Sequence, residues 1–221
     1  MLTIFGDEKG SEFASAIGIT DAKLLLFPIK STEGIFKLIT CPYVLNRWLE
    51  DIGKSLVNLT VEDSEYIPLD KTINGKIVLE EYIFSKVENL NDSKHVLTIL
   101  DTIKNANKNC VDTSKVVILN DTTFVDLVTM YTEVITRNKI DVATGTAEGT
   151  GLFTEEYLPC ESVMYFNVLG SPSFDSKNPF ESQNVLDYFN KYINSVFQVG
   201  GNATIGKGLV KVLNPVDRKS T

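Results

Sequence analysis

The sequence has little cysteine, histidine, proline or glycine for a chain of 221 residues. Its 3 cysteines, 7 prolines and 14 glycines exclude a disulfide scaffold, a collagen-like chain and a low-complexity chain. It lacks the roughly 18–20 consecutive apolar residues that a membrane-spanning helix needs, and it lacks the basic and then apolar start of a signal peptide. Because the cysteines are far apart and odd in number, we predict reduced thiols and a cytoplasmic protein.

The same scarcity limits the metal and nucleic-acid chemistry that can be expected. The one histidine, His95, and the separated Cys41, Cys110 and Cys160 form no cluster at the spacing that zinc requires. No metal site and no tightly bound cofactor are therefore predicted. The formal net charge of −8 argues against a free-standing nucleic-acid binder, which is usually basic, but it leaves room for a local RNA-binding face.

Apolar periodicity predicts strands and helices that are interleaved without a regular alternation. The most regular helical stripe follows Pro42 and runs from Val44 to Leu56, and Asp121 is placed to cap a shorter helix. Several strands follow one another directly, which favours an α+β fold over a doubly wound sheet. Helices are predicted at residues 42–56, 93–107, 121–131 and 185–196, strands at 1–5, 16–29, 34–40, 77–79, 116–119, 133–141, 162–169, 197–199 and 209–212, a turn at 74–75 and a flexible loop at 143–151.

A glycine-rich segment near the C-terminus differs from a nucleotide-binding loop in its last position. Residues 201–208 spell GNATIGKG, whereas that loop ends in Ser or Thr and is followed by a helix. Here Leu209 to Val212 alternate like a strand, so we predict a tight β–loop–β crossing. The glycines could serve the turn alone, or they could also let a phosphodiester approach the backbone amides beside Lys207.

Four stretches in the same order resemble one protein family. Residues 197–210 (FQVGGNATIGKGLV) resemble the C-terminal glycine loop of the RAMP superfamily of CRISPR proteins. Residues 21–31 (DAKLLLFPIKS), 40–45 (TCPYVL) and 151–159 (GLFTEEYLP) are similar to three stretches of one RAMP branch. The glycine loop is shared by many RAMPs, whereas the combination resembles the backbone subunits of type III-B (Cmr) effectors.

This resemblance implies a fold. It is a single RAMP domain over residues 1–221, with a modified ferredoxin-like or RRM-like palm and a β-hairpin thumb inserted at about residues 137–160. The glycine-rich loop lies at residues 200–208. The resemblance also implies an N-terminally incomplete domain, because family members carry an earlier segment with a His and a catalytic Asp that has no counterpart here.

The resemblance further implies site residues, each with a simpler structural alternative. Glu155 and Tyr157 would lie near the cleaved phosphate as auxiliary catalytic residues, or they are a solvated acid beside a core tyrosine. Leu152 and Phe153 would be apolar wedges of the thumb, or they pack within the hairpin. The candidate RNA-binding residues are Lys30, Ser31, Lys37, Arg137, Lys139, Leu152, Phe153, Gly200, Gly201, Gly206, Lys207 and Gly208.

The function implied by the resemblance is that of an RNA-binding backbone subunit of a type III-B ribonucleoprotein in antiviral defence. Its partners would be guide (CRISPR) RNA, target RNA, other Cmr subunits and copies of itself in a filament, without a membrane. A divalent metal (Mg) would be needed only for cleavage by a complete subunit. The alternatives are a stand-alone metal-dependent endoribonuclease that uses carboxylates such as Asp21, Glu155 and Glu156, or a purely structural oligomerisation domain. We also expect the glycine loop and residues 155–159 to share one RNA-holding surface.

Overall fold

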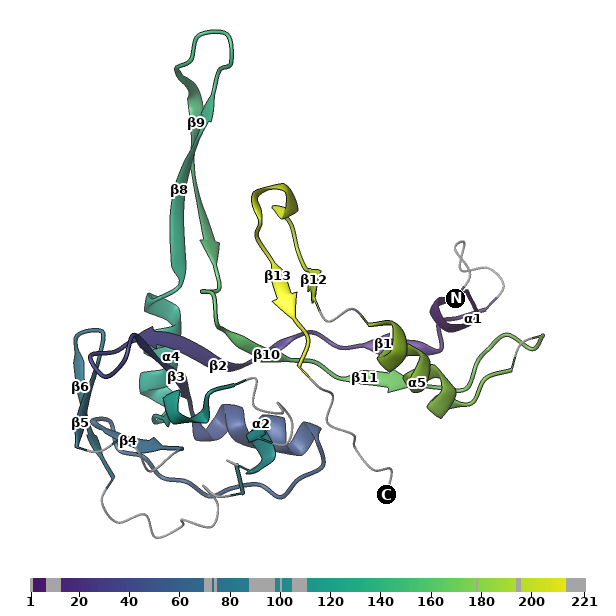
Figure 1. Cartoon of the computed structure of the whole chain (residues 1–221), viewed down its shortest axis with the longest axis horizontal. Helices are drawn as coiled ribbons and strands as arrows, with labels where there is room; N and C mark the ends of the chain where they lie inside the picture. The colour runs from purple at the N-terminus through teal and green to yellow at the C-terminus, as the bar shows by residue number, and fades with distance from the viewer. Residues whose placement is uncertain are drawn as a thin grey trace. The chain divides into compact units, whose positions relative to one another are not determined.

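The computed structural model describes residues 2–6, 13–69, 73, 75–87, 98–99, 101–104, 111–177, 179–193 and 196–213 (Figure 1). Contacts group these residues into two compact units. Residues between 2 and 23 and between 165 and 213 belong to the first unit, and those between 24 and 104 and between 111 and 164 belong to the second. The single domain over residues 1–221 stays a prediction.

The second unit is built on a seven-stranded mixed sheet with the order β10-β2-β3-β7-β4-β6-β5. In this sheet β3 is parallel to β7 and β4 is parallel to β6, whereas β2–β3, β4–β7 and β5–β6 are antiparallel pairs. Helices and a mixed sheet together make the α+β fold that was predicted. The strands are β2 (Lys23–Lys30), β3 (Phe36–Thr40), β4 (Glu65–Pro68), β5 (Lys76–Leu79), β6 (Tyr82–Lys86), β7 (Val116–Ile118) and β10 (Val163–Tyr165).

The middle of this sheet is apolar on both faces. Leu25, Leu26 and Phe27 of β2 are consecutive and all buried. Because neighbouring side chains of a strand point to opposite faces, such a run occurs where both faces are covered. The strands predicted at residues 34–40, 77–79 and 116–119 are confirmed as β3, β5 and β7. The strand predicted at residues 16–29 is in fact two strands, because residues 20–22 separate β1 (Ile17–Ile19) from β2.

Helix α2 (Pro42–Asp51) confirms the helix predicted after Pro42. Proline suits this start because the first helical N–H has no partner within the helix. The predicted stripe is too long, because the helix ends before Leu56, which is exposed. Asn46 fixes the segment that follows, since its side chain both donates to Val57 O at 2.9 Å and accepts from Val57 N at 2.8 Å. The buried side chains of α2 are Val44, Leu45, Trp48 and Leu49.

Helix α4 (Asp121–Met130) confirms the short helix, but its predicted cap is wrong. Asn120 is the N-cap, and its Oδ1 accepts the backbone N–H of Thr123 at 2.7 Å. Asp121 is the first helical residue, and its carboxylate accepts the N–H of Tyr43 at 2.9 Å. Residues 113–115 form the short 3-10 helix η1. No helix among the described residues is long and apolar enough to cross a membrane.

Part of the helix predicted at residues 93–107 can be checked. Residues 98–99 and 101–104 are helical, and Ile99 and Ile103 are buried, as an inward-facing apolar stripe requires. The rest of that prediction, together with His95, Cys110 and Asn74, lies outside the described residues.

The first unit has a small apolar core made by its helices and a strand pair. β1 is antiparallel to β11 (Val168–Gly170), and α5 (Ser182–Tyr192) lies against β11. The strand predicted at residues 1–5 is wrong, because α1 (Leu2–Phe5) is one helical turn that buries Ile4 against this core. The other buried residues of the core are Ala16, Ile17 and Val185.

The end of the first unit is a separate two-stranded hairpin. β12 (Val196–Gln198) is antiparallel to β13 (Leu209–Lys211), and the 3-10 helix η2 (Ala203–Ile205) lies between them in the chain. The predicted strands at residues 197–199 and 209–212 are thereby confirmed. The helix predicted at residues 185–196 begins and ends earlier than predicted, since α5 spans residues 182–192 and Val196 belongs to β12.

Candidate nucleic-acid interface

The β8–β9 hairpin is a ribbon of two strands with no third strand beside it in the described part of the chain (Figure 1). β8 (Glu133–Ile140) and β9 (Ala147–Tyr157) are antiparallel, and the register shifts between Asn138 and Ile140. The hairpin therefore starts before the predicted thumb boundary at residue 137. Because isolated hairpins are marginally stable in water, its side-chain pairs must contribute much of its order.

The turn of this hairpin is shorter than the loop predicted at residues 143–151. From Ala147 onward the backbone already belongs to β9, so the turn comprises residues 141–146. Asp141 closes it, since its Oδ1 accepts the N–H groups of Ala143 at 2.7 Å and Thr144 at 3.1 Å. An Asp side chain that bonds the backbone two residues ahead is a usual way to tighten a turn. The predicted loop at residues 143–151 is therefore a shorter turn, and Leu152 and Phe153 lie in β9.

One face of the hairpin carries a cluster of three charged or polar side chains. Arg137 and Glu155 are diagonal neighbours across the strands, and Arg137 Nε lies 2.8 Å from Glu155 Oε2. The N–H at Nε is not directed at that oxygen, so the contact is an ion pair and not a linear hydrogen bond. Tyr157 Oη donates to the same oxygen at 2.6 Å, and the Arg137 guanidinium lies 5.9 Å from the Tyr157 ring centroid. Glu155 is thus held by two neighbours on its own hairpin.

Leu152 and Phe153 point to opposite faces of the hairpin. Phe153 pairs with Arg137, whereas Leu152 pairs with Asn138, and adjacent residues of a strand alternate in direction. Phe153 therefore shares the face of Arg137, Glu155 and Tyr157. Leu152 is 74% exposed and Phe153 is 47% exposed, so neither is a packed core residue. The simpler alternative of packing within the hairpin is thereby disfavoured, and the role of Leu152 and Phe153 as wedges stays a prediction.

The glycine-rich segment forms the loop of the β12–β13 hairpin. Lys207 is followed by β13 and not by a helix, which confirms the predicted β–loop–β crossing and removes the nucleotide-binding alternative. The φ angle is positive at Gly200, Gly206 and Gly208 (78°, 78° and 72°). Gly208 is the most constrained of them, because a Cβ there would overlap the carbonyl oxygen of Val199. The glycines are therefore required by the turn, whatever else they do.

Gln198 is a residue of this loop that the sequence did not single out. Its side-chain Nε2 lies at hydrogen-bonding distance from four backbone carbonyl oxygens of the loop. Those carbonyls belong to Val199 (3.1 Å), Gly200 (2.8 Å), Gly201 (3.3 Å) and Lys207 (3.4 Å). A glutamine two residues before a glycine pair was the only available signal, and nothing in the pattern shows that its side chain folds back over the loop.

Lys30 and Ser31 lie where β2 ends and the chain turns toward β3. The Lys30 side chain is 84% exposed, and its Nζ lies 3.8 Å from Glu80 Oε2. Ser31 forms an isolated bridge with Leu79, and its Oγ accepts the N–H of Glu33 at 3.2 Å. The Glu80 side chain is only 14% exposed, so the carboxylate is largely covered while the Lys30 ammonium stays accessible to a phosphate.

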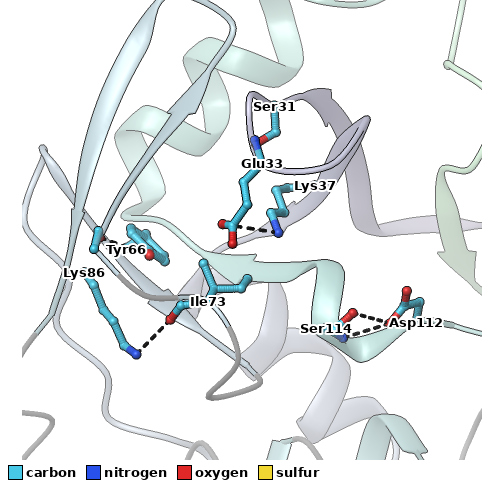
Figure 2. Close-up of polar contacts among 9 residues, drawn as sticks. Ser31, Glu33, Lys37, Tyr66, Ile73, Lys86, Asp112 and Ser114 are labelled. Atoms are coloured by element: carbon cyan, nitrogen blue, oxygen red, sulfur yellow. Dashed lines mark hydrogen bonds and ion pairs between the residues drawn. The ribbon is translucent and has the colours of Figure 1, made fainter.

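Lys37 was expected among the exposed lysines, and that expectation is wrong. Its side chain is 7% exposed, and its Nζ lies 3.6 Å from Glu33 Oε2 (Figure 2). A buried ammonium needs such a partner, because an unpaired buried charge is costly. Hydrogen bonds from Ser114 lower the pKa of Asp112, and the charge of Lys37 contributes in the same direction. The Lys37 side chain thus forms an internal ion pair in the second unit and presents little surface to an external ligand.

Lys139 and Lys207 are the remaining lysines among the predicted RNA-binding residues. Lys139 lies on the exposed part of β8, while the side chain of Lys207 is half-buried in the glycine loop. Within the described ranges, no group of three or more His, Cys, Asp or Glu side chains could hold a metal ion. Glu155, the candidate carboxylate of the hairpin, is already engaged by Arg137 and Tyr157.

Comparisons with known proteins give a consistent result. A family model described as the RAMP superfamily matches residues 2–211. A curated relative, the CRISPR system Cmr endoribonuclease Cmr4 of Pyrococcus furiosus, is 35% identical over 95% of this chain and 73% of its own length. The crystal structure of oligomeric Cmr4 from Pyrococcus furiosus matches with a TM-score of 0.70 and 25% identity, covering 95% of this chain and 74% of that one. A cryo-EM structure of the type III-B Cmr-beta bound to cognate target RNA matches in fold, with a TM-score of 0.70 and 20% identity over 96% of this chain and 74% of the other.

Proposed function

The chain belongs to the RAMP superfamily, and from this premise we propose that it is an RNA-binding backbone subunit of a type III-B CRISPR effector. The observation that carries the proposal is the 35% identity to Cmr4 over 95% of the chain. In this role copies of the chain stack along a guide RNA and position a target RNA for cleavage. The solved relatives named as oligomeric, and as part of a complex bound to target RNA, support it.

The glycine hairpin is the surface that we assign to the phosphate backbone of guide RNA. Gly200, Gly201, Gly206 and Gly208 carry no side chain that would keep a phosphodiester away from the loop backbone. Lys207 adds a positive charge in the same loop, and phosphate contacts of this kind give affinity without reading sequence. The chain as a whole is acidic, so its basic groups must act locally.

The β8–β9 hairpin is the surface that we assign to the bases. Phe153 offers an exposed aromatic ring beside Arg137, and stacking on such a pair tolerates any base. Glu155 orients Arg137 and Tyr157 on this face, and Lys139 extends its positive charge toward the turn. Leu152 lies on the opposite face, where it is free to contact a second strand or a neighbouring subunit.

Lys30 and Ser31 are proposed as a further phosphate contact, and Lys37 is left out because it is buried. Auxiliary catalytic roles for Glu155 and Tyr157 would require the ion pair with Arg137 to open. The described residues do not provide a carboxylate cluster that fits a magnesium ion, so no metal-dependent step is assigned to them.

One alternative has an observation in its favour. The curated relative is named an endoribonuclease, so the purified chain could cleave RNA without other subunits. Cleavage of naked RNA by the chain and magnesium ions alone would support this alternative over the role of a backbone subunit.

The experiment is a fluorescence-anisotropy titration of a labelled single-stranded oligoribonucleotide at several salt concentrations. Binding should weaken as salt rises, because phosphate contacts release counterions. Lys207→Ala should lower the slope of log affinity against log salt by about 0.7, the contribution of one phosphate contact in a single strand. Lys191→Ala removes the same charge from α5 of the same unit and is the matched control. Absence of RNA binding, or binding that is independent of salt, would refute the proposal.

A further inference from the structure

Gln198 is the last residue of β12, and its side-chain amide lies against the backbone of the glycine hairpin. We propose that Gln198 is a positioning residue, which turns the N–H groups of the loop outward so that they can bind a phosphodiester. This inference rests on the proposed role of the loop in RNA binding.

The geometry around Gln198 is unusual for an exposed hairpin. A glutamine amide carries two hydrogens, yet Nε2 lies 2.8–3.4 Å from four carbonyl oxygens. These oxygens come from both sides of the loop, namely Val199, Gly200 and Gly201 before it and Lys207 after it. The absence of a side chain at Gly208 makes this possible, since a Cβ there would lie only 3.3 Å from Nε2 as well as overlapping Val199 O.

The carbonyl groups of Val199 and Gly200 point toward Gln198. The N–H groups at the other end of the same peptides, those of Gly200 and Gly201, therefore point away from it. The N–H groups of Gly200 and Gly201 have no hydrogen-bond acceptor in the described part of the chain, and both residues are exposed. The φ angle is positive at Gly200 and at Asn202 (78° and 61°) but not at Gly201. Successive N–H groups in a turn conformation form the backbone concavities that bind anions.

A loop with paired glycines would not keep this orientation unaided. Glycine has no Cβ, so the peptide between Gly200 and Gly201 can flip and present its carbonyl to solvent instead. An outward carbonyl oxygen repels a phosphate, whereas an outward N–H binds it. Donation from Gln198 favours the state with the N–H outward. The apparent affinity for a phosphate is proportional to the fraction of the loop that is in this state.

The test compares Gln198→Met with Gln183→Met in the full chain. Both substitutions remove a side-chain amide donor from the same unit, and the Gln183 amide donates to Asp187 on α5 at 2.9 Å, away from the glycine loop in the chain. The probe is a short single-stranded oligoribonucleotide, followed by the amide NMR signals of Gly200 and Gly201 and by anisotropy. Hydrogen exchange of the Val199 amide, which bonds Gly208 O at 2.8 Å, reports whether the hairpin stays formed.

In the wild type and in Q183M, RNA should shift both glycine amide signals. Q198M should keep the Val199 protection, lose those shifts and bind RNA about tenfold more weakly, as expected when hydrogen bonds to a charged group are lost. Q198M with wild-type shifts and affinity would overturn the role of Gln198 and leave the loop as the RNA site. Wild-type glycine signals that do not move at saturating RNA would instead remove the loop from the RNA site.

A second variant tests the proposal in case Q198M prevents the hairpin from forming. If Q198M loses the Val199 protection, Gln198→Lys supplies an ammonium that can donate to the same carbonyls. Recovery of both the protection and the glycine shifts in Q198K would support the proposal. Recovery of the protection alone, or of neither, would overturn it.

Discussion

Gly208→Ala should open the β12–β13 hairpin far more than Gly206→Ala does. Both glycines have positive φ (72° and 78°), so each substitution costs about 1–2 kcal/mol for left-handed backbone. At Gly206 no atom of the described residues lies within 4 Å of the added Cβ, so no further cost is expected. At Gly208 the Cβ overlaps Val199 O, so the strands must separate, and the hydrogen bond from Val199 N to Gly208 O (2.8 Å) breaks for about 1 kcal/mol more.

The assay is native-state hydrogen exchange of the Val199 amide. The sum of about 2–3 kcal/mol predicts roughly 30–150-fold faster exchange in G208A, against about tenfold in G206A. G208A should also weaken RNA binding, since the loop no longer presents its backbone in one conformation. Equal exchange in the two variants would show that the close approach of Gly208 to Val199 does not hold the hairpin together.

Three further predictions concern the other parts of the chain. Phe153→Ala should weaken RNA binding about tenfold, which is the worth of one lost stacking contact. Leu152→Ala should weaken it less than twofold. The reverse order, measured by anisotropy, would contradict the assignment of the bases to the Phe153 face of the hairpin. Gly170→Ala should lower the free energy of unfolding by about 1–3 kcal/mol, seen as a lower denaturant midpoint, because its Cβ would lie 2.8 Å from a backbone oxygen of α5. Gly149→Ala should not, since no described atom lies within 4 Å of the added Cβ. Burial raises the pKa of Tyr66 from 10 to about 12, so the wild type should lose up to about 2–3 kcal/mol of stability as pH rises through 10–12. Tyr66→Phe should not show this loss when the free energy of unfolding is measured against pH. Parallel curves for the two proteins would refute the role given to Tyr66.

The parts of the fold that could be predicted are those that periodicity determines. Continuous apolar runs give the buried strands β2 and β7, and the stripe after Pro42 gives α2. Boundaries were less predictable, because they depend on local side-chain to backbone bonds. Asn120 and Asp121 are both good caps, and only the structure shows that Asn120 accepts from Thr123 while Asp121 bonds Tyr43.

The site was predictable in its segments but not in its side-chain partners. Strand alternation separates Leu152 from Phe153 as soon as both are known to lie in β9, yet the sequence pattern predicted no strand there and placed a loop at residues 143–151 just before them. A lysine in a strand normally faces water, and the burial of Lys37 depends on Glu33 across a turn. The role of Gln198 required the loop to fold first, since its four acceptors are backbone atoms whose positions no residue pattern encodes.

The most direct test of the account is to map where RNA touches the chain, by photocrosslinking a 4-thiouridine oligoribonucleotide and identifying the attached peptides. The account predicts crosslinks in the glycine hairpin (residues 196–211) and on the Phe153 face of the β8–β9 hairpin. Lys207→Ala should reduce the first set and Phe153→Ala the second. Crosslinks confined to other segments, with neither hairpin labelled, would contradict the claim that these two hairpins hold the RNA.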